Sequence, residues 1–236
     1  MFNRILVIIF FFSSLSAAAP YTHAYLTKRL FEEFPYYTPQ ERQAFMVGTL
    51  FPDIRYLGEA KRHDTHINHV TLEAVLNESD PFRAGVLFHS YVDEKREALL
   101  VEKGVYDPVR KTIPVHTATF IKLVEDEVLC REKNYSDVIV ALISILPGEK
   151  QYQISESTLN KWHKLLTLYF ISSPSFSLNV ITLLNKGVGG ISAEELKNWN
   201  VHLKPMSQEG ILNAWTVDLV KYFEDDFSKH KIALVP

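Results

Sequence analysis

A histidine and an aspartate spaced four residues apart are the strongest chemical signal in this chain. His89 and Asp93 stand in the segment Phe-His-Ser-Tyr-Val-Asp, and a four-residue step puts two side chains on one face of a helix. Residues 84 to 88 are apolar, so this helix is predicted to be central and buried. A buried charge must be paired or must bind a ligand, and we predict that these side chains hold a metal ion. The alternative without metal is an internal network in which Asp93 accepts from His89 or Arg96.

Three upstream segments carry further nitrogen and oxygen donors. They contain His23, Asp53, and the pair His66 and His69. Imidazole nitrogen and carboxylate oxygen bind zinc at about 2 Å, and helices hold such ligands rigidly. We therefore predict a metal site in the first half of the chain. The remaining histidines outside these patterns are expected to be ordinary core or surface residues, namely His63, His163, His202 and His230.

The charge balance argues against binding to duplex nucleic acid. The formal net charge is −3, and the sequence contains no long run of basic residues. Proteins bind a nucleic-acid backbone through clustered positive charge. We therefore expect no duplex nucleic acid among the partners.

The periodicity of apolar residues predicts an all-α, single-domain helical bundle. A chain of 236 residues with 47% hydrophobic content can bury one sizeable core. Apolar residues recur at steps of three and four within 84 to 100, 115 to 129, 138 to 146 and 211 to 223, whereas strand patterns are nearly absent. Thr38, Asp80 and Ser192 each stand where a capping residue precedes a helix.

One uncharged stretch is long enough to cross a membrane. It covers residues 165 to 185, but its centre reads Ser-Ser-Pro-Ser at 172 to 175. Proline interrupts a helix, so we predict two shorter buried helices instead of a membrane span.

The first residues have the layout of a secretory signal. Arg4 precedes an apolar stretch at 5 to 12, and small residues follow at 13 to 19. We predict cleavage after Ala18, which leaves one domain at 19–236 and places the protein in the periplasm or outside the cell. An uncleaved anchor is the alternative. Cys130 is the single cysteine, so no intrachain disulfide can form, and its apolar surroundings predict a buried residue.

The order of these segments resembles a known family. A Thr-His pair at 22 and 23, Gly-Thr-Leu-Phe-Pro-Asp at 48 to 53, Arg-His-Asp-Thr-His at 62 to 66, and the helix segment at 85 to 93 are together similar to the zinc-dependent phospholipase C family. That family shares its helical fold with the S1/P1 nucleases. The resemblance covers residues of about 20 to 120.

The resemblance implies a cluster of up to three zinc ions that cleaves phosphodiester bonds. It assigns Asp53, His66, His89 and Asp93 to one tetrahedral zinc, with His69 as the alternative to His66. In the family a second zinc is shared by an early histidine, the bridging carboxylate and the free amino group of the mature chain; the first two match His23 and Asp93.

The sequence departs from the family pattern at several points. The family's mature chain begins with tryptophan, and residues 17 to 21 contain none. Leu99 stands where the family has a further histidine. His116 could be a later histidine ligand, but Phe120 stands where its acidic partner would be. We therefore expect one to three zinc ions, with two as the favoured number.

The resemblance implies a zinc-activated water as the nucleophile, and Asp53 is also predicted to orient that water. The expected activity is phosphodiester hydrolysis, on phospholipid head groups in the first place. Phe34, Tyr36 and Tyr37 could then contact a membrane surface, although ordinary loop packing also explains them.

Three other functions are open. They are a nuclease-like enzyme on the same fold, an HD-type phosphohydrolase suggested by His63 and Asp64, and an exported module that holds metal for stability without catalysis.

Overall fold

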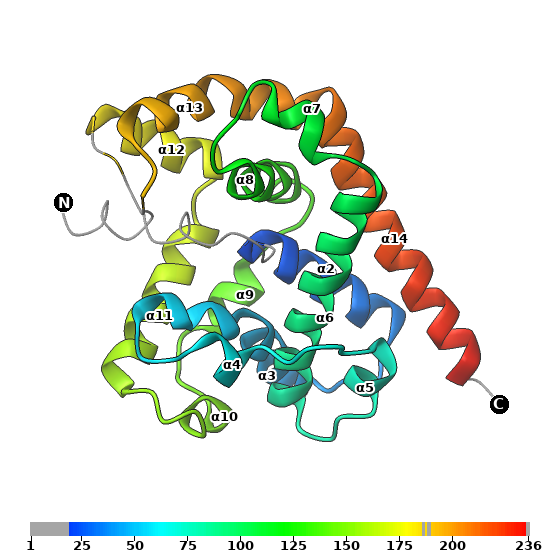
Figure 1. Cartoon of the computed structure of the whole chain (residues 1–236). Coiled ribbons are helices and arrows are strands. Elements are labelled where there is room, and N and C mark those ends of the chain that lie inside the picture. Colours follow the sequence, from blue (N-terminus) through cyan, green and yellow to red (C-terminus); the bar gives the residue numbers. More distant parts are fainter. Residues whose placement is uncertain (1–18, 186, 188–189, 235–236) are drawn as a thin grey trace.

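Helices form the framework of the residues that this computed structural model describes, which are 19–185, 187 and 190–234 (Figure 1). The segment predicted as a signal, 1–18, lies outside them. No β-strand occurs within these ranges, so the prediction of an all-α, single-domain protein is confirmed. The longer helices are α2 (Pro20–Glu33), α3 (Pro39–Leu50), α6 (Pro81–Glu102), α8 (Thr117–Leu129), α11 (Glu156–Phe170), α12 (Pro174–Leu183), α13 (Ala193–Gln208) and α14 (Ile211–Leu234). The short ones are η2 (Pro52–Leu57), α4 (Arg62–Thr65), α5 (Leu72–Leu76), α7 (Tyr106–Arg110), α9 (Ser136–Ala141) and α10 (Pro147–Lys150).

The predicted capping residues begin their helices. The Thr38 hydroxyl accepts from the backbone of Glu41, whose side chain accepts in return from the Thr38 backbone. Ser192 and Glu195 repeat this arrangement at α13, and the Asp80 carboxylate caps α6. These side chains satisfy backbone N–H groups that a first turn leaves without partners.

The helix expected at 138 to 146 is shorter than the apolar pattern predicted. It is α9, which ends at Ala141. Pro147 begins α10 and forces the preceding Leu146 into an extended conformation, with ψ of 154°. The proline therefore bars a helical conformation only at the end of the apolar run, and residues 142–146 form turns and irregular backbone.

The uncharged stretch folds as two helices, as predicted. α11 ends at Phe170, α12 begins at Pro174, and their axes differ by 103°. Within the described ranges no single helix is long and apolar enough to cross a membrane; this bent pair alone meets the length and composition criteria together.

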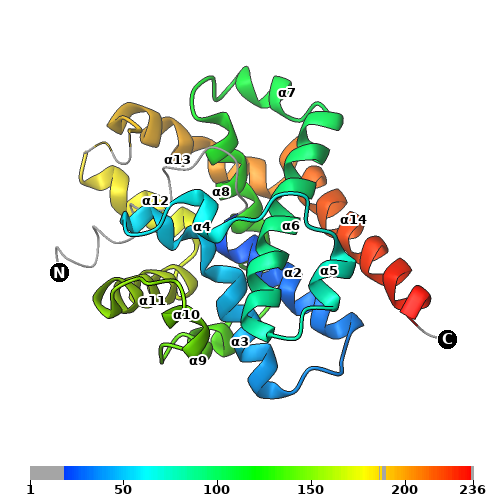
Figure 2. The ribbon, with the colours of Figure 1, turned by 60° about the horizontal axis from the view of Figure 1, so that its bottom comes forward.

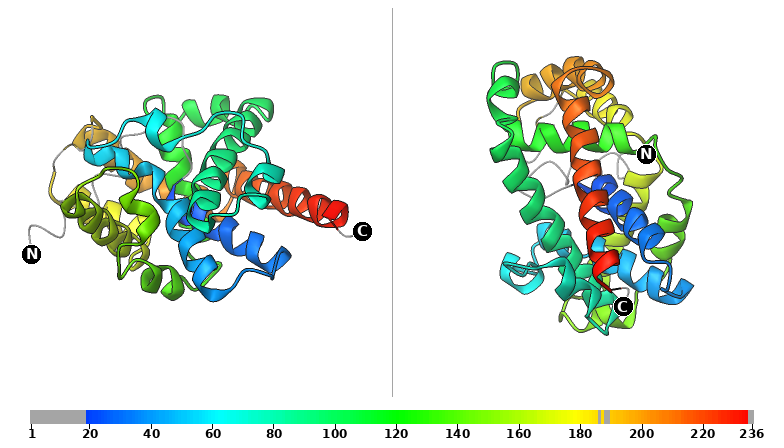
Figure 3. Two further views of the ribbon diagram at one scale, coloured as in Figure 1. Left: turned by 90° about the horizontal axis from the view of Figure 1, so that it is seen from below. Right: turned by 90° about the vertical axis from the view of Figure 1, so that its right-hand side faces the viewer.

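α6 runs through the middle of the molecule and contributes to both apolar cores (Figure 2). Phe88 belongs to the core shared with α8, α13 and α14, and Val86 belongs to the core shared with α3, α9 and α11. α14 passes along one flank, where it packs on α2 and α8 (Figure 3). A polar residue in the middle of α6 is consequently enclosed on several sides.

α3 and α6 touch backbone to backbone at two glycines. A β-carbon at Gly85 would lie 2.1 Å from the carbonyl oxygen of Phe45, and one at Gly48 would lie 2.0 Å from that of Phe82. Any side chain at these positions would push the helices apart. The contact therefore fixes how deeply α6 sits against α3.

Gly85→Ala is expected to destabilise the protein by about 3 kcal/mol or to prevent folding, because backbone atoms cannot move aside as a flexible side chain can. Arg83→Ala, at an exposed position of the same helix, is the control and should change stability by less than about 0.5 kcal/mol. Urea denaturation measures both. Equal stability of the two variants would contradict the assigned role of the contact.

Candidate metal centre

Five of the predicted ligands converge in the interior. His23 comes from the first turn of α2, Asp53 from η2, and His66 from the residue after α4, whereas His89 and Asp93 lie in the middle of α6. None of them is more than 8% exposed. Four separate segments thus bring their polar side chains to one buried place.

The distances between ligand atoms match those around a small cation. Nε2 of His23 lies 3.3 Å from Oδ1 of Asp93, and Nε2 of His89 lies 3.4 Å from its Oδ2. The Nε2 atoms of His66 and His89 are 3.3 Å apart. Ligands at tetrahedral zinc, each about 2.0 Å from the ion, are separated by about 3.3 Å.

The ligand atoms form two overlapping groups. One contains His23, His89 and Asp93, and the other contains Asp53, His66 and His89. His89 belongs to both, and the Asp93 carboxylate also lies 3.8 Å from His66. Asp53 is at the edge, 3.9 Å from His66. The arrangement can accommodate one ion or two ions that share a ligand.

Hydrogen bonds on the far side of two rings determine their tautomers. Nδ1 of His89 faces the Thr49 carbonyl oxygen at 2.9 Å and must carry a proton to donate. The Thr65 hydroxyl donates to the Pro52 carbonyl, so it accepts from Nδ1 of His66 at 3.0 Å. When both rings are neutral, each therefore turns a lone pair on Nε2 toward the centre, as metal-bound histidines do.

Two facing lone pairs repel unless a cation lies between them. A proton or a metal ion can serve; burial makes the proton costly at His66, whereas Asp93 raises the pKa of His89 and so favours the proton there. Burial, followed by the positive charge of His89, lowers the pKa of His66 to about 2. The same two causes lower the pKa of His23 to about 4. His66 and His23 are therefore neutral near pH 7, and the neutral imidazole is the form that binds metal.

Asp93 supplies the negative charge of the centre. Burial alone would raise its pKa, but His89 and His23 together hold it well below the ordinary range. Burial opposes protonation of His89, and Asp93 more than compensates, so the pKa of His89 is raised. Without metal, the His89–Asp93 pair is the internal network that was the alternative. No ion pair between Asp93 and Arg96 occurs among the described residues, because Arg96 pairs with Glu125.

Asp126 on α8 holds the first turn of α2, which carries His23. Its carboxylate accepts from the backbone of Tyr21 and Thr22 at 3.0 and 2.8 Å, and from the hydroxyls of Thr22 and Tyr169. Burial raises the pKa of Asp126 to about 7 although these donors favour the ionised form. No motif in the sequence identified Asp126; the run of three acidic residues at 125 to 127 within an apolar helix was the available signal.

His69 and His116 lie outside both groups. His69 is exposed, adopts a φ of 58°, and its backbone donates to Glu94, so His66 is the member of its segment that joins the centre. His116 stands at the start of α8, with Nε2 3.9 Å from Glu195. His163, set aside from the sequence, is a buried residue with hydrogen-bond partners on both ring nitrogens.

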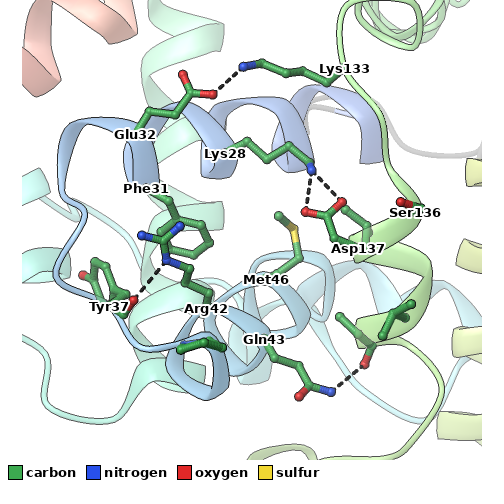
Figure 4. Close-up of a pocket in the computed structure, with 14 residues that line it drawn as sticks. Lys28, Phe31, Glu32, Tyr37, Arg42, Gln43, Met46, Lys133, Ser136 and Asp137 are labelled. Carbon is green, nitrogen blue, oxygen red and sulfur yellow. Dashed lines mark hydrogen bonds and ion pairs between the residues drawn. The ribbon is translucent and has the colours of Figure 1, made fainter.

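A hollow of about 310 Å³ reaches the centre from the surface. Its wall includes His66, Asp93, Arg62, Asn68, Glu94 and Glu97. A larger hollow, of about 930 Å³, lies elsewhere, between α2, α3 and α9, and its wall includes none of the five converging residues (Figure 4). Lys28 pairs there with Asp137 and Lys133 with Glu32, and Arg42 donates to the backbone carbonyls of Pro35 and Tyr37.

The fold and the centre together define an all-α protein with buried histidine and aspartate groups that could hold metal. Comparisons with family models, with curated proteins and with solved structures found no match to this chain. The resemblance drawn from the sequence motifs is thus a hypothesis that rests on those residues.

We expect His66→Ala to weaken zinc binding at least tenfold, because the variant lacks the Nε2 atom that faces Nε2 of His89. His69→Ala is the matched control, three residues away and exposed, and should bind zinc as the unaltered protein does. Elemental analysis and competition with a chromogenic chelator measure both. Loss of zinc in the His69 variant instead would show that the other histidine is the ligand.

The metal-free protein should show a pH dependence that originates in His66. Its pKa is about 2 when folded against an ordinary 6.5, so below pH 6.5 the unfolded chain takes up a proton that the folded protein does not. Stability is therefore lost as pH falls, by about 2 kcal/mol from this residue at pH 5.

His89 and Asp126, with raised pKa values, act in the opposite direction, so a difference between variants is the useful quantity. Between pH 7 and pH 5, His66→Gln should lose about 1 to 2 kcal/mol less than the unaltered protein in urea denaturation. His69→Gln should behave as the unaltered protein. Parallel pH profiles for all three proteins would refute this assignment.

Proposed function

We propose that this protein is an exported, zinc-dependent phosphodiester hydrolase similar to phospholipase C. The observation that carries the proposal is the pair of Nε2 atoms of His66 and His89, which face each other at 3.3 Å beside a buried carboxylate. Such a set fits zinc, because neutral imidazoles and a carboxylate are its usual ligands. The order of the motifs supplies the reaction class.

The proposed ligand sets divide the residues of the two overlapping groups as the family resemblance implies, with Asp93 instead of His89 as the shared ligand. Asp53, His66, His89 and Asp93 would hold one ion, and His23 with Asp93 would hold a second. Cleavage after Ala18 would free the amino group of Ala19, whose carbonyl oxygen accepts from the His23 backbone at 3.1 Å. That amino group is the proposed further ligand of the second ion. Leu99 and His116 contribute to neither group, which favours two ions over three.

The protein residues hold the reacting groups in place. Zinc, when bound, supplies Lewis acidity toward water and toward the phosphoryl group. Asp53 is the residue we propose to orient the water, because its Oδ1 atom accepts no hydrogen bond from a described residue. The Arg55 guanidinium lies 3.6 Å from that oxygen and stacks over Tyr56, which restrains the carboxylate. Burial keeps competing water away.

The wall of the hollow favours a small phosphodiester over a nucleic-acid strand. That wall contains the three carboxylates of Asp93, Glu94 and Glu97 and one arginine, Arg62. A polyanionic strand would be repelled there, and single-strand binding uses basic grooves with stacking aromatics. A phospholipid head group, with one bridging phosphate, is the proposed substrate.

Two earlier suggestions gain no support from the structure. Phe34 is buried and Tyr37 packs on the core, which leaves Tyr36 alone exposed, at the far end of α2 from His23. A membrane contact through this loop therefore stays a prediction without a link to the centre. His63 and Asp64 of the HD-type alternative are exposed on α4 and belong to neither ligand group.

The zinc-loaded protein should hydrolyse bis(4-nitrophenyl) phosphate, and a chelator should abolish the activity. Asp53→Asn should lower kcat at least a hundredfold, because the amide cannot accept a proton or orient the water in the same way. Asp64→Asn, a change of the same type at an exposed position, is the control. Release of nitrophenolate measures the rates.

Zinc retained without hydrolysis of phospholipid, nucleic-acid and chromogenic substrates would exclude both enzymatic functions. The protein would then be the non-catalytic module, stabilised by metal in the absence of disulfides. Hydrolysis of single-stranded nucleic acid but not of phospholipid would favour the nuclease-like alternative.

A further inference from the structure

The corner between α11 and α12 exposes large apolar side chains that belong to neither apolar core of the described residues. Ile171 at the C-cap of α11 is 62% exposed, and Phe176 and Leu183 on α12 are 59% and 85% exposed. Phe176, Val180 and Leu183 are spaced by four and three residues, so they follow one face of α12. These four residues are called the apolar corner below.

The apolar corner lies in a segment without charge. Residues 165 to 185 contain no Asp, Glu, Lys or Arg. Exposed helices of globular proteins usually carry interspersed charges, which keep their apolar side chains from associating with one another. A helix face that exposes phenylalanine and leucine without charges is therefore typical of a surface that contacts another apolar phase.

Lysines border the apolar corner on both neighbouring helices. On α11, Lys164 is exposed two turns before the corner. On α13, Lys197 and Lys204 are exposed on one face, and Asn200, between them in the sequence, donates to Asn179 of α12 at 2.8 Å. Apolar side chains flanked by lysines match a bilayer surface, because the apolar groups enter the lipid while the ammonium groups meet phosphate oxygens.

The N-terminal end of α2 lies beside the same corner. The Tyr21 hydroxyl lies 3.2 Å from the carbonyl oxygens of Tyr169 and Ser172, which end α11. Ala19 stands two residues before Tyr21 and follows the apolar stretch at 5 to 12 in the sequence. With the uncleaved anchor, Ala19 would lie within about 25 Å of that stretch, which is the full reach of the intervening residues. The sequence that enters a membrane during export is thus joined to the protein next to the apolar corner.

The fold restricts the apolar corner to a membrane surface. α11 and α12 together have the length and composition of a span, but they are bent by 103°. The inner face of α11 belongs to a core, where Trp162, Leu165 and Phe170 are buried and the Trp162 indole donates to the Leu50 carbonyl at 3.1 Å. Crossing a bilayer would remove these side chains from that core. Only the outward side chains are therefore available to lipid.

We propose that the apolar corner docks the protein on the surface of a phospholipid bilayer. Ile171, Phe176 and Leu183 enter the boundary of the acyl chains, and the bordering lysines lie among the head groups. Helices with such a face lie in the interface at a depth of about 5 to 10 Å. The docking rests on the export that is part of the proposed function, but it needs neither zinc nor hydrolysis.

Sedimentation with vesicles of phosphatidylcholine and anionic phosphatidylglycerol tests the docking. The protein is the exported form, with its N-terminus determined by sequencing. Phe176→Ser combined with Leu183→Ser should raise Kd for the vesicles at least tenfold, because both changes remove exposed apolar surface. Ile232→Ser is the control and should bind as the unaltered protein does. Ile232 is 76% exposed at the end of α14, across the molecule from α12 (Figures 1 and 2).

Tryptophan fluorescence locates the contact whether or not the N-terminal segment is cleaved. Leu183→Trp should lose fluorescence on vesicles of brominated lipid, because bromine on the acyl chains quenches an indole that reaches them. Ile232→Trp should not. The natural tryptophans, Trp162, Trp199 and Trp215, are buried and give both variants the same background. This measurement carries the test if the double serine variant does not fold, which circular dichroism checks.

Three results overturn the docking. They are no binding of the unaltered protein to vesicles, an unchanged Kd in the double serine variant, and equal quenching of the two tryptophan variants. A dimer that the double serine variant converts to a monomer, seen by light scattering without vesicle binding, assigns the corner to a second copy and overturns the docking as well.

The two proposals fail separately. The double serine variant should keep its zinc content and its hydrolysis of bis(4-nitrophenyl) phosphate, because the changed residues lie outside both ligand groups. Vesicle binding that this variant loses, in a protein without zinc or hydrolysis, supports the docking and refutes the proposed function. Zinc and hydrolysis in a protein that ignores vesicles refute only the docking.

Discussion

The backbone contact between α3 and α6 is the constraint on which the centre depends. Gly48 and Gly85 allow the helices to approach until carbonyl oxygens occupy the space of missing β-carbons. One residue beyond Gly48, the Thr49 carbonyl accepts from His89, which lies one turn beyond Gly85. The close approach therefore also sets the tautomer of the ring, because a wider separation would remove the acceptor of its Nδ1 proton.

Burial gives the centre its electrostatic character. Low polarity keeps His23 and His66 neutral, and the protonated form of His89 compensates Asp93 only while no metal is present. The protein thus maintains lone pairs and one carboxylate at short range, an arrangement that is unfavourable by itself and suited to a cation.

Local sequence patterns predicted the helix starts and part of the candidate site, whereas the remaining features of the site depend on packing between distant segments. Proline and capping side chains act within a few residues, so the starts of α3, α6 and α13 could be read from Thr38, Asp80 and Ser192. The four-residue step of His89 and Asp93 likewise predicted a shared face. The choice of His66 over His69 depends on which one the turn after α4 directs inward, and the contribution of Asp126 depends on contacts with distant helices.

The capping of α2 by Asp126 has a consequence for the order of assembly. The carboxylate that satisfies the first turn of α2 comes from a residue 105 positions after Tyr21, so that turn gains its cap only after α8 has docked. His23 lies on this turn, so its position beside Asp93 depends on the docking of α8. The complete set of candidate ligands therefore exists only when α8 is docked against α2.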